Sequence, residues 1–206
     1  MATIQAVENQ DYFWPVLSTT IYFLLFQVFM VNQIWSKIVA GRRLGDPRLL
    51  DRFDYSSKHW EMGDRSFLNF LEQTPAVVAL MWMDAIFCSA RSAGIALLVY
   101  CVFRLLFPVF WAVKGRWNLL IEASTQPCYA IMNYWTASLL YLAVTGRQLG
   151  AVMPSNVLLV VIVVVLIHLG LTVVVFLVGG AFAKLLEQGF ESEGASPLEE
   201  SSSDAA

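Results

Sequence analysis

Charged residues are scarce in this chain. Asp, Glu, Lys and Arg make up 14% of its 206 residues, against roughly 25% in an average soluble domain. Hydrophobic residues make up 58%, and the mean hydropathy is +0.62. This composition excludes an ordinary soluble domain. We expect an integral membrane protein of the all-α class, because a helix satisfies its own backbone hydrogen bonds inside lipid.

Cysteine is also rare, and several chemical signatures are missing. The three cysteines, Cys88, Cys101 and Cys128, all fall in apolar stretches, so their odd number argues against a disulfide framework. We find no Cys/His spacing typical of a metal site, no glycine-rich phosphate loop and no Ser/His/Asp or Cys/His arrangement. Basic residues between 37 and 65 alternate with acids, which argues against nucleic-acid binding and favours lipid headgroups as neighbours.

Five apolar stretches approach the roughly 20 residues needed to cross a bilayer. The N-terminus lacks the basic region of a cleavable signal peptide, so we expect the first stretch to act as its own insertion signal. A C-terminal segment rich in Ser, Glu and Ala should be disordered. We therefore divide the chain into an N-terminal segment (1–13), a four-helix bundle (14–146, with spans near 14–35, 67–88, 93–112 and 124–144), an additional transmembrane helix (155–184) and an acidic tail (187–206).

Basic residues indicate the orientation of these spans. Ten of the 13 Lys and Arg residues fall in the first loop, between the third and fourth spans, or after the fifth. Positive charge accumulates on the cytosolic side of membrane proteins. We therefore expect the N-terminus outside and the C-terminus in the cytosol.

Three polar residues at the start of the second span form the most informative motif. Arg65, Asn69 and Glu72 are spaced by four and three positions, so a helix places them on one face. Ionisable groups are costly in a bilayer and mark functional sites by default. The alternative is that Arg65 lies in water and Glu72 pairs with a basic residue on a neighbouring helix.

The third span carries a candidate partner for this motif. Arg104 lies in its cytosolic half, at a depth comparable to Glu72 on the antiparallel second span, so the two can pair or share a ligand. Asp84 is 12 residues beyond Glu72, about 18 Å away at helical rise. We expect Asp84 to serve as a helix contact near the opposite surface.

These polar groups gather at the cytosolic end of the predicted bundle. Arginine holds a carboxylate through two hydrogen bonds, and a glutamate accepts from an ammonium group. Such a rim suits a small anionic ligand that also carries an amine. The candidate residues are Lys37, Arg42 or Arg43, Arg65, Asn69, Glu72, Arg104 and Arg116.

Three segments follow one another in order: Asp64–Pro75 (DRSFLNFLEQTP), Leu80–Trp82 and Tyr100–Pro108 (YCVFRLLFP). Together they resemble the MAPEG superfamily, the membrane-associated proteins in eicosanoid and glutathione metabolism. The resemblance covers about residues 15 to 146. It implies a four-helix transmembrane bundle that forms a homotrimer in an intracellular membrane such as the endoplasmic reticulum. It also implies glutathione bound between subunits near the cytosolic face.

Site residues follow from this resemblance position by position. It implies that Arg65, Asn69, Glu72 and Arg104 contact glutathione, with Lys37 nearest to the family's arginine on the first span. Arg116 and Arg104 would act in catalysis, with Arg116 standing where the family has the arginine that polarises the thiol. The expected activity is that of a glutathione transferase or peroxidase acting on a lipophilic electrophile or a lipid hydroperoxide.

Three departures from the family pattern keep an alternative open. Phe107 and Trp111 stand where the family often has tyrosine, and the fifth span and the acidic tail have no family counterpart. The family also contains non-enzymatic members that bind lipid and present it to a partner. The chain can therefore also be a lipid-binding or structural subunit of a membrane assembly, joined to a protein partner through the fifth helix or the tail. A small transporter using Asp84 and His168 is a third reading.

Overall fold

A computed structural model describes residues 11–45, 58–114, 116 and 118–194. This part of the chain is helical and contains no strand. The long helices are α1 (Phe13–Leu44), α2 (Lys58–Asp84), α3 (Ala90–Lys114), α4 (Leu119–Thr145) and α5 (Val157–Gly194), with a short π-helix η2 (Ala85–Ser89) and a 3-10 helix η3 (Leu149–Ala151). The chain divides into two compact units, Met1–Ile167 and His168–Ala206, and the first holds α1 to α4.

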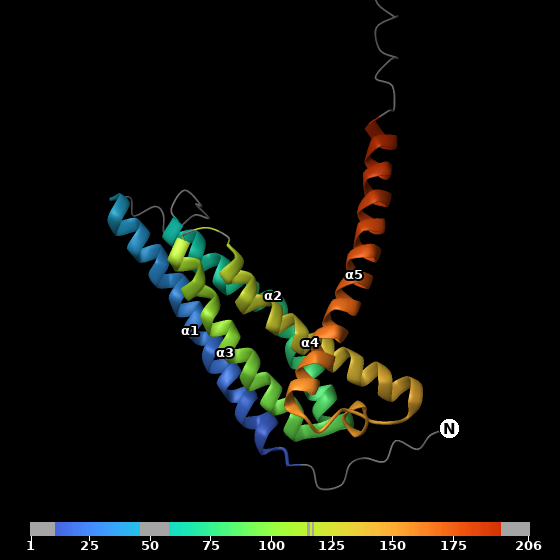
Figure 1. The fold of residues 1–206 in the computed structure, drawn as a ribbon. Coiled ribbons are helices and arrows are strands. Elements are labelled where there is room, and N and C mark those ends of the chain that lie inside the picture. Colours follow the sequence, from blue (N-terminus) through green and yellow to red (C-terminus); the bar gives the residue numbers. More distant parts are fainter. Residues whose placement is uncertain (1–10, 46–57, 115, 117, 195–206) are drawn as a thin grey trace, which may run out of the picture. The chain divides into compact units, whose positions relative to one another are not determined.

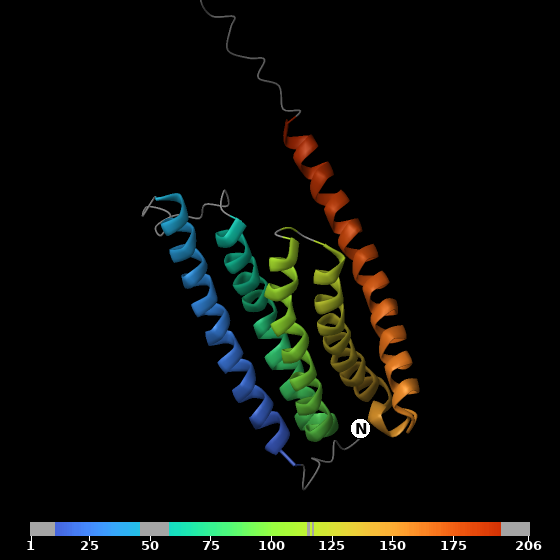
Figure 2. The same ribbon diagram turned by 60° about the vertical axis from the view of Figure 1, so that its left-hand side comes forward.

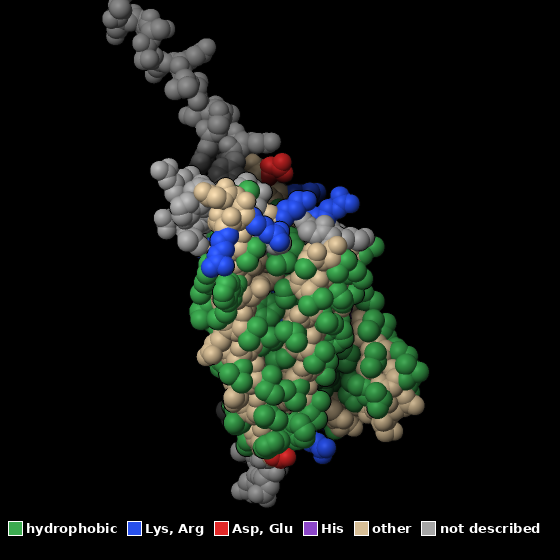
Figure 3. All heavy atoms as spheres, turned by 90° about the vertical axis from the view of Figure 1, so that its left-hand side faces the viewer, with side chains coloured by type: hydrophobic (Ala, Val, Ile, Leu, Met, Phe, Trp, Pro, Cys, Tyr) green, Lys and Arg blue, Asp and Glu red, His purple; other side chains and the backbone are tan. Residues whose placement is uncertain are grey.

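Three helical stretches of the described chain are long and apolar enough to cross a membrane: Phe13–Leu44, Trp60–Val113 and Val157–Leu185. The second covers both α2 and α3, so four of the five predicted spans fall inside these stretches. The fourth predicted span, in α4, does not, because polar residues such as Gln126 and Asn133 lower its hydropathy. Figure 3 shows an apolar flank of the bundle with most of the visible Lys and Arg side chains at one end. The chain is a helical membrane protein.

Helices α2 and α3 are the antiparallel arms of a hairpin whose tip is η2. The Tyr100 hydroxyl donates to Gln73 Oε1 at 2.7 Å, and Arg104 Nη2 donates to the Asn69 carbonyl oxygen at 2.6 Å. Moving up α3 from Tyr100 to Arg104 therefore moves down α2 from Gln73 to Asn69. This register places Arg104 at the depth of Asn69, one helical turn from Glu72, whose depth we expected it to share.

Helix α1 continues this alternation of direction. On α1, Tyr22 Oη lies 2.9 Å from Thr74 Oγ1, and Gln33 Nε2 donates to Asp64 Oδ1 at 2.6 Å. These two pairs make α1 antiparallel to α2. Figures 1 and 2 show α1 to α4 running side by side within the first unit.

Stacked aromatic rings fill the contact between α1 and α2. The ring of Phe70 lies 4.8 Å from that of Tyr22 and 5.1 Å from that of Phe29, both close to parallel. All three side chains are buried. Aromatic pairs of this kind add about 0.5–1.5 kcal/mol each beyond the area that they bury, so they fix the register of α2 against α1.

Asp84 forms a polar contact at the hairpin tip. Its side chain is 1% exposed and lies within hydrogen-bonding reach of the Ser138 hydroxyl on α4 and the Cys88 thiol in η2. This agrees with the predicted role as a helix contact. The position also separates Asp84 from the Arg65–Glu72 motif at the other end of α2.

Helix α5 is the most apolar element, with a mean hydropathy of 3.2 over its best membrane-length window. It continues to Gly194, into the segment from 187 that we predicted to be disordered. Residues such as Leu185 and Glu187 have high helix propensity, which explains the extension. The rest of the predicted tail, 195–206, and the N-terminal residues 1–10 lie outside the described residues.

Candidate functional site

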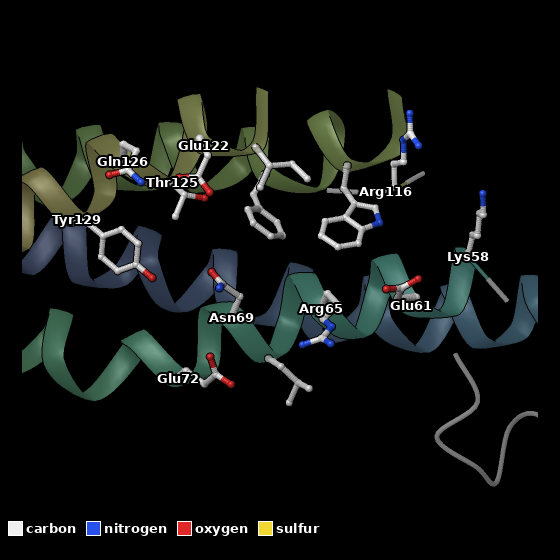
Figure 4. Close-up of a pocket in the computed structure, with 14 residues that line it drawn as sticks. Lys58, Glu61, Arg65, Asn69, Glu72, Arg116, Glu122, Thr125, Gln126 and Tyr129 are labelled. Carbon is white, nitrogen blue, oxygen red and sulfur yellow. Dashed lines mark hydrogen bonds between the residues drawn. The ribbon is translucent and has the colours of Figure 1, made fainter. Parts of the chain in front are cut away.

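A cavity of about 700 Å³ lies between α2, α3 and α4 in the first unit. Figure 4 shows its charged and polar side chains arranged along α2 and α4. Its walls combine cations, carboxylates and apolar groups. The lining residues are Lys58, Glu61, Arg65, Leu68, Asn69, Glu72, Phe107, Trp111, Arg116, Ile121, Glu122, Thr125, Gln126 and Tyr129.

Helix α2 supplies the polar wall predicted from the sequence. Arg65, Asn69 and Glu72 all line the cavity, as their helical spacing indicated. Arg65 and Glu72 are exposed, and Asn69 is half-buried. The Asn69 Oδ1 atom is buried and has no hydrogen-bond partner among the described residues. This wall therefore offers a cation, a carboxylate and an amide oxygen that is ready to accept a hydrogen bond.

Arg116 joins the same cavity through the short connection between α3 and α4. The side chain of Asn118 caps α4, since its Oδ1 accepts from Leu120 N at 3.0 Å. The same side chain donates from Nδ2 to the Arg116 carbonyl at 3.0 Å and to the Phe110 carbonyl at 3.3 Å. One capping residue thus ties the backbone at Arg116 to both helices.

Arg104 lies behind the α2 wall and does not line the cavity. Its side chain is 1% exposed. Its guanidinium lies over the rings of Phe70, Tyr100 and Phe107, at 5.9, 6.0 and 5.5 Å from their centroids. Its one hydrogen bond within the described structure goes to the carbonyl of Asn69. Arg104 is therefore linked to the cavity through Asn69, which lines the cavity.

The charge of Arg104 is not neutralised within the described residues. Its Nε and Nη1 atoms are buried without a hydrogen-bond partner. The pair with Glu72 that we considered is not formed, because Glu72 faces outward while Arg104 is turned into the core. A buried cation without a counterion is expensive, and such a group is a candidate for binding an anion.

Lys37 lies away from the cavity. Its Nζ atom is 4.8 Å from the centroid of the Trp60 ring, a cation–π contact between α1 and α2. The structure therefore brings together Arg65, Asn69, Glu72 and Arg116, places Arg104 directly behind them and leaves Lys37 outside the lining. In the described part of the chain, no group of three or more His, Cys, Asp or Glu side chains could hold a metal ion.

Helix α4 supplies a second polar wall that we did not predict. Glu122, Thr125, Gln126 and Tyr129 line the cavity, and Gln126 Nε2 donates to the Glu122 carboxylate. Their spacing of three, one and three positions is that of one helical face, a signal that was present in the sequence. Sequence alone did not say that this face turns toward α2.

Comparison with protein-family models, with curated proteins and with solved structures finds no match to this chain.

Proposed function

We propose that this protein is a MAPEG-like membrane enzyme that binds glutathione in the cavity between α2, α3 and α4. Four helices form the bundle, α5 is an added span, and three copies assemble in an intracellular membrane such as the endoplasmic reticulum, with the basic end of the bundle in the cytosol. The reaction is a transfer of glutathione to a lipophilic electrophile or the reduction of a lipid hydroperoxide.

One observation carries this proposal: Arg104 is buried beside the cavity with two nitrogen atoms unpartnered in the described structure. An unpaired buried cation destabilises the free protein. An anionic ligand would offset that cost. Arg65, Lys58 and Arg116 line the same cavity together with Glu61, Glu72 and Glu122, so a ligand that carries both carboxylate and ammonium groups fits this end of the bundle.

The cavity also matches the neutral and cationic groups of glutathione. The buried Oδ1 of Asn69 can accept a hydrogen bond from a peptide N–H group. Glu72 and Glu61 provide carboxylates for the ligand's ammonium group. Cations lower the pKa of a bound thiol and stabilise its thiolate, which is the reactive nucleophile. No nucleophile from the protein is required for such a reaction.

Helix α5 supports a second function, that of a lipid-binding or structural subunit. Its window from Val157 to Leu185 has a mean hydropathy of 3.2 and includes Gly179, Gly180 and Ala181, small residues that permit close helix contact. A helix so uniformly apolar can pack against a partner protein in the membrane. In that case the protein would assemble normally but would bind no glutathione.

The test is glutathione binding to the purified full-length protein in lipid nanodiscs, measured by isothermal titration calorimetry. We expect saturable binding that weakens by about 10- to 100-fold in each of the variants Arg65→Ala and Glu72→Ala, since each removes a charge-assisted hydrogen bond worth about 1.5–3 kcal/mol.

Arg147→Ala serves as the matched control. Arg147 is also an exposed arginine but follows α4 at the far end of the bundle, so its loss should leave the affinity unchanged. A folded wild-type protein that binds no glutathione would contradict the enzyme proposal and favour the structural subunit.

A further inference from the structure

Two hydroxyl groups on the α4 wall have no role in the binding described above. Thr125 and Tyr129 are four positions apart, on one face of α4, and both line the cavity. Figure 4 shows Tyr129 directing its hydroxyl across the gap toward Asn69. These two residues bring uncharged hydrogen-bond donors to the end of the cavity that holds Asn69 and Glu72.

Thr125 differs from other threonines of the same helix. Thr136 and Thr145 donate their hydroxyls to the carbonyls of Met132 and Tyr141, four residues earlier, at 3.0 and 2.7 Å. The Thr125 side chain is only 7% exposed, yet its Oγ1 has no hydrogen-bond partner in the described structure. A buried hydroxyl without a partner costs about 1–3 kcal/mol, so its retention on a cavity wall points to a ligand atom as its partner.

Apolar side chains line the same cavity as these hydroxyls. Phe107, Trp111 and Ile121 form a small buried cluster that lines the same cavity. A partner suited to this wall therefore has a hydrocarbon body and one oxygen atom that accepts hydrogen bonds. Preorganised neutral donors stabilise most strongly an oxygen that becomes negative during the reaction.

We propose that Thr125 and Tyr129 form the oxyanion-stabilising part of the site, and that the second substrate is a lipid aldehyde or ketone with a conjugated carbon–carbon double bond. This inference rests on the proposed glutathione-dependent function. The conjugated carbonyl compound would then be the electrophile of that reaction, and Thr125 and Tyr129 would be two further catalytic residues of the cavity.

The reaction is an addition that needs no other reagent. The glutathione thiolate attacks the β-carbon and forms the carbon–sulfur bond. The double-bond electron pair then joins the α-carbon to the carbonyl carbon, and the carbonyl electron pair moves onto the oxygen. Thr125 and Tyr129 donate hydrogen bonds to this enolate oxygen. The α-carbon finally takes a proton from water, which replaces the proton lost by the thiol, and the carbonyl re-forms.

The test uses two electrophiles with the full-length protein in nanodiscs. One is trans-2-nonenal, a conjugated aldehyde; the other is benzyl chloride, whose leaving group is chloride and whose reaction makes no oxygen anion. We expect Thr125→Val and Tyr129→Phe each to lower kcat/KM for nonenal by about 10- to 100-fold, while kcat/KM for benzyl chloride and the glutathione affinity stay within about twofold of wild type.

Thr136→Val and Tyr141→Phe are the matched controls, because both residues belong to α4 and neither lines the cavity. They should leave both reactions unchanged. The inference is overturned if Thr125→Val and Tyr129→Phe leave the nonenal reaction unchanged. It is equally overturned if they slow both electrophiles alike, which would indicate a purely structural role. A wild type that binds no glutathione instead removes the proposed function itself, so the two failures are distinguishable.

Discussion

Replacement of Arg104 by methionine is expected to weaken glutathione binding by about 100-fold, equivalent to about 2.7 kcal/mol, without lowering the stability of the free protein. Arg104 is 1% exposed, and two of its nitrogen atoms lack partners in the described structure. Replacing a buried charge by an apolar side chain of similar volume is often neutral or stabilising. Calorimetric binding and the midpoint of thermal unfolding, measured on the same preparation, check both halves of this expectation.

The expected combination of weaker binding and undiminished stability makes the Arg104 test specific. A residue kept only for structure would lose stability on replacement, whereas a residue kept for an anion loses affinity and not stability. Arg104→Lys keeps a positive charge but loses the planar group that binds carboxylates through two hydrogen bonds, so its affinity should fall between those of wild type and Arg104→Met. Unchanged binding in Arg104→Met would show that the cavity does not use this cation.

Substitution of Gly94 by leucine is expected to lower the free energy of unfolding by about 3 kcal/mol or more. Gly94 lies on α3 where α3 meets the start of α1, and a Cβ atom there would fall on the backbone of Trp14 and Pro15. Backbone atoms cannot rotate away as a side chain can, so the helices themselves must separate. Overpacking of a well-packed core typically costs about 1–3 kcal/mol, and leucine adds further atoms beyond Cβ. Unfolding in detergent, followed by circular dichroism, measures the loss.

Gly170→Leu provides the comparison for Gly94. Gly170 is also a helical glycine, but a Cβ atom placed on it meets no atom within 4 Å. Its replacement should leave the unfolding transition in place. If Gly94→Leu is as stable as Gly170→Leu, the close contact of α1 and α3 is not part of the native bundle.

Much of the bundle could be predicted from hydrophobic stretches and charge. The positions of α1, α2 and α3 followed from apolar runs of membrane length. The antiparallel order of the second and third spans predicted that Arg104 lies near the depth of Glu72, and its observed partner Asn69 is one helical turn away. The helical class needed only the composition. The exact ends of the helices could not be predicted from the apolar segments. Helix α1, for example, extends beyond its apolar segment into polar sequence and ends at Leu44.

The candidate site was predictable on one wall only. Periodicity within α2 places Arg65, Asn69 and Glu72 on one face whatever the tertiary structure, and all three line the cavity. The rotation of α4 about its axis depends on packing against α3, so Thr125 and Tyr129 could not be assigned to the cavity. The direction of the Arg104 side chain could not be predicted either. Its depth along α3 follows from the sequence, but its packing against the aromatic rings of the core does not.

Protection of a cysteine placed in the cavity tests most directly whether glutathione binds between α2, α3 and α4. The native cysteines, Cys88, Cys101 and Cys128, are all buried, so labelling by a maleimide should report an introduced thiol. Gln126→Cys places that thiol on the α4 wall, and Gly150→Cys places it in η3, with open space around it.

We expect S-hexylglutathione, which has no free thiol, to slow the labelling of the Gln126→Cys variant by about tenfold when its concentration is about ten times its Kd. Labelling of the Gly150→Cys variant should not change. Equal labelling of the Gln126→Cys variant with and without a saturating concentration of S-hexylglutathione would contradict the account, because the ligand would then lie elsewhere or not bind.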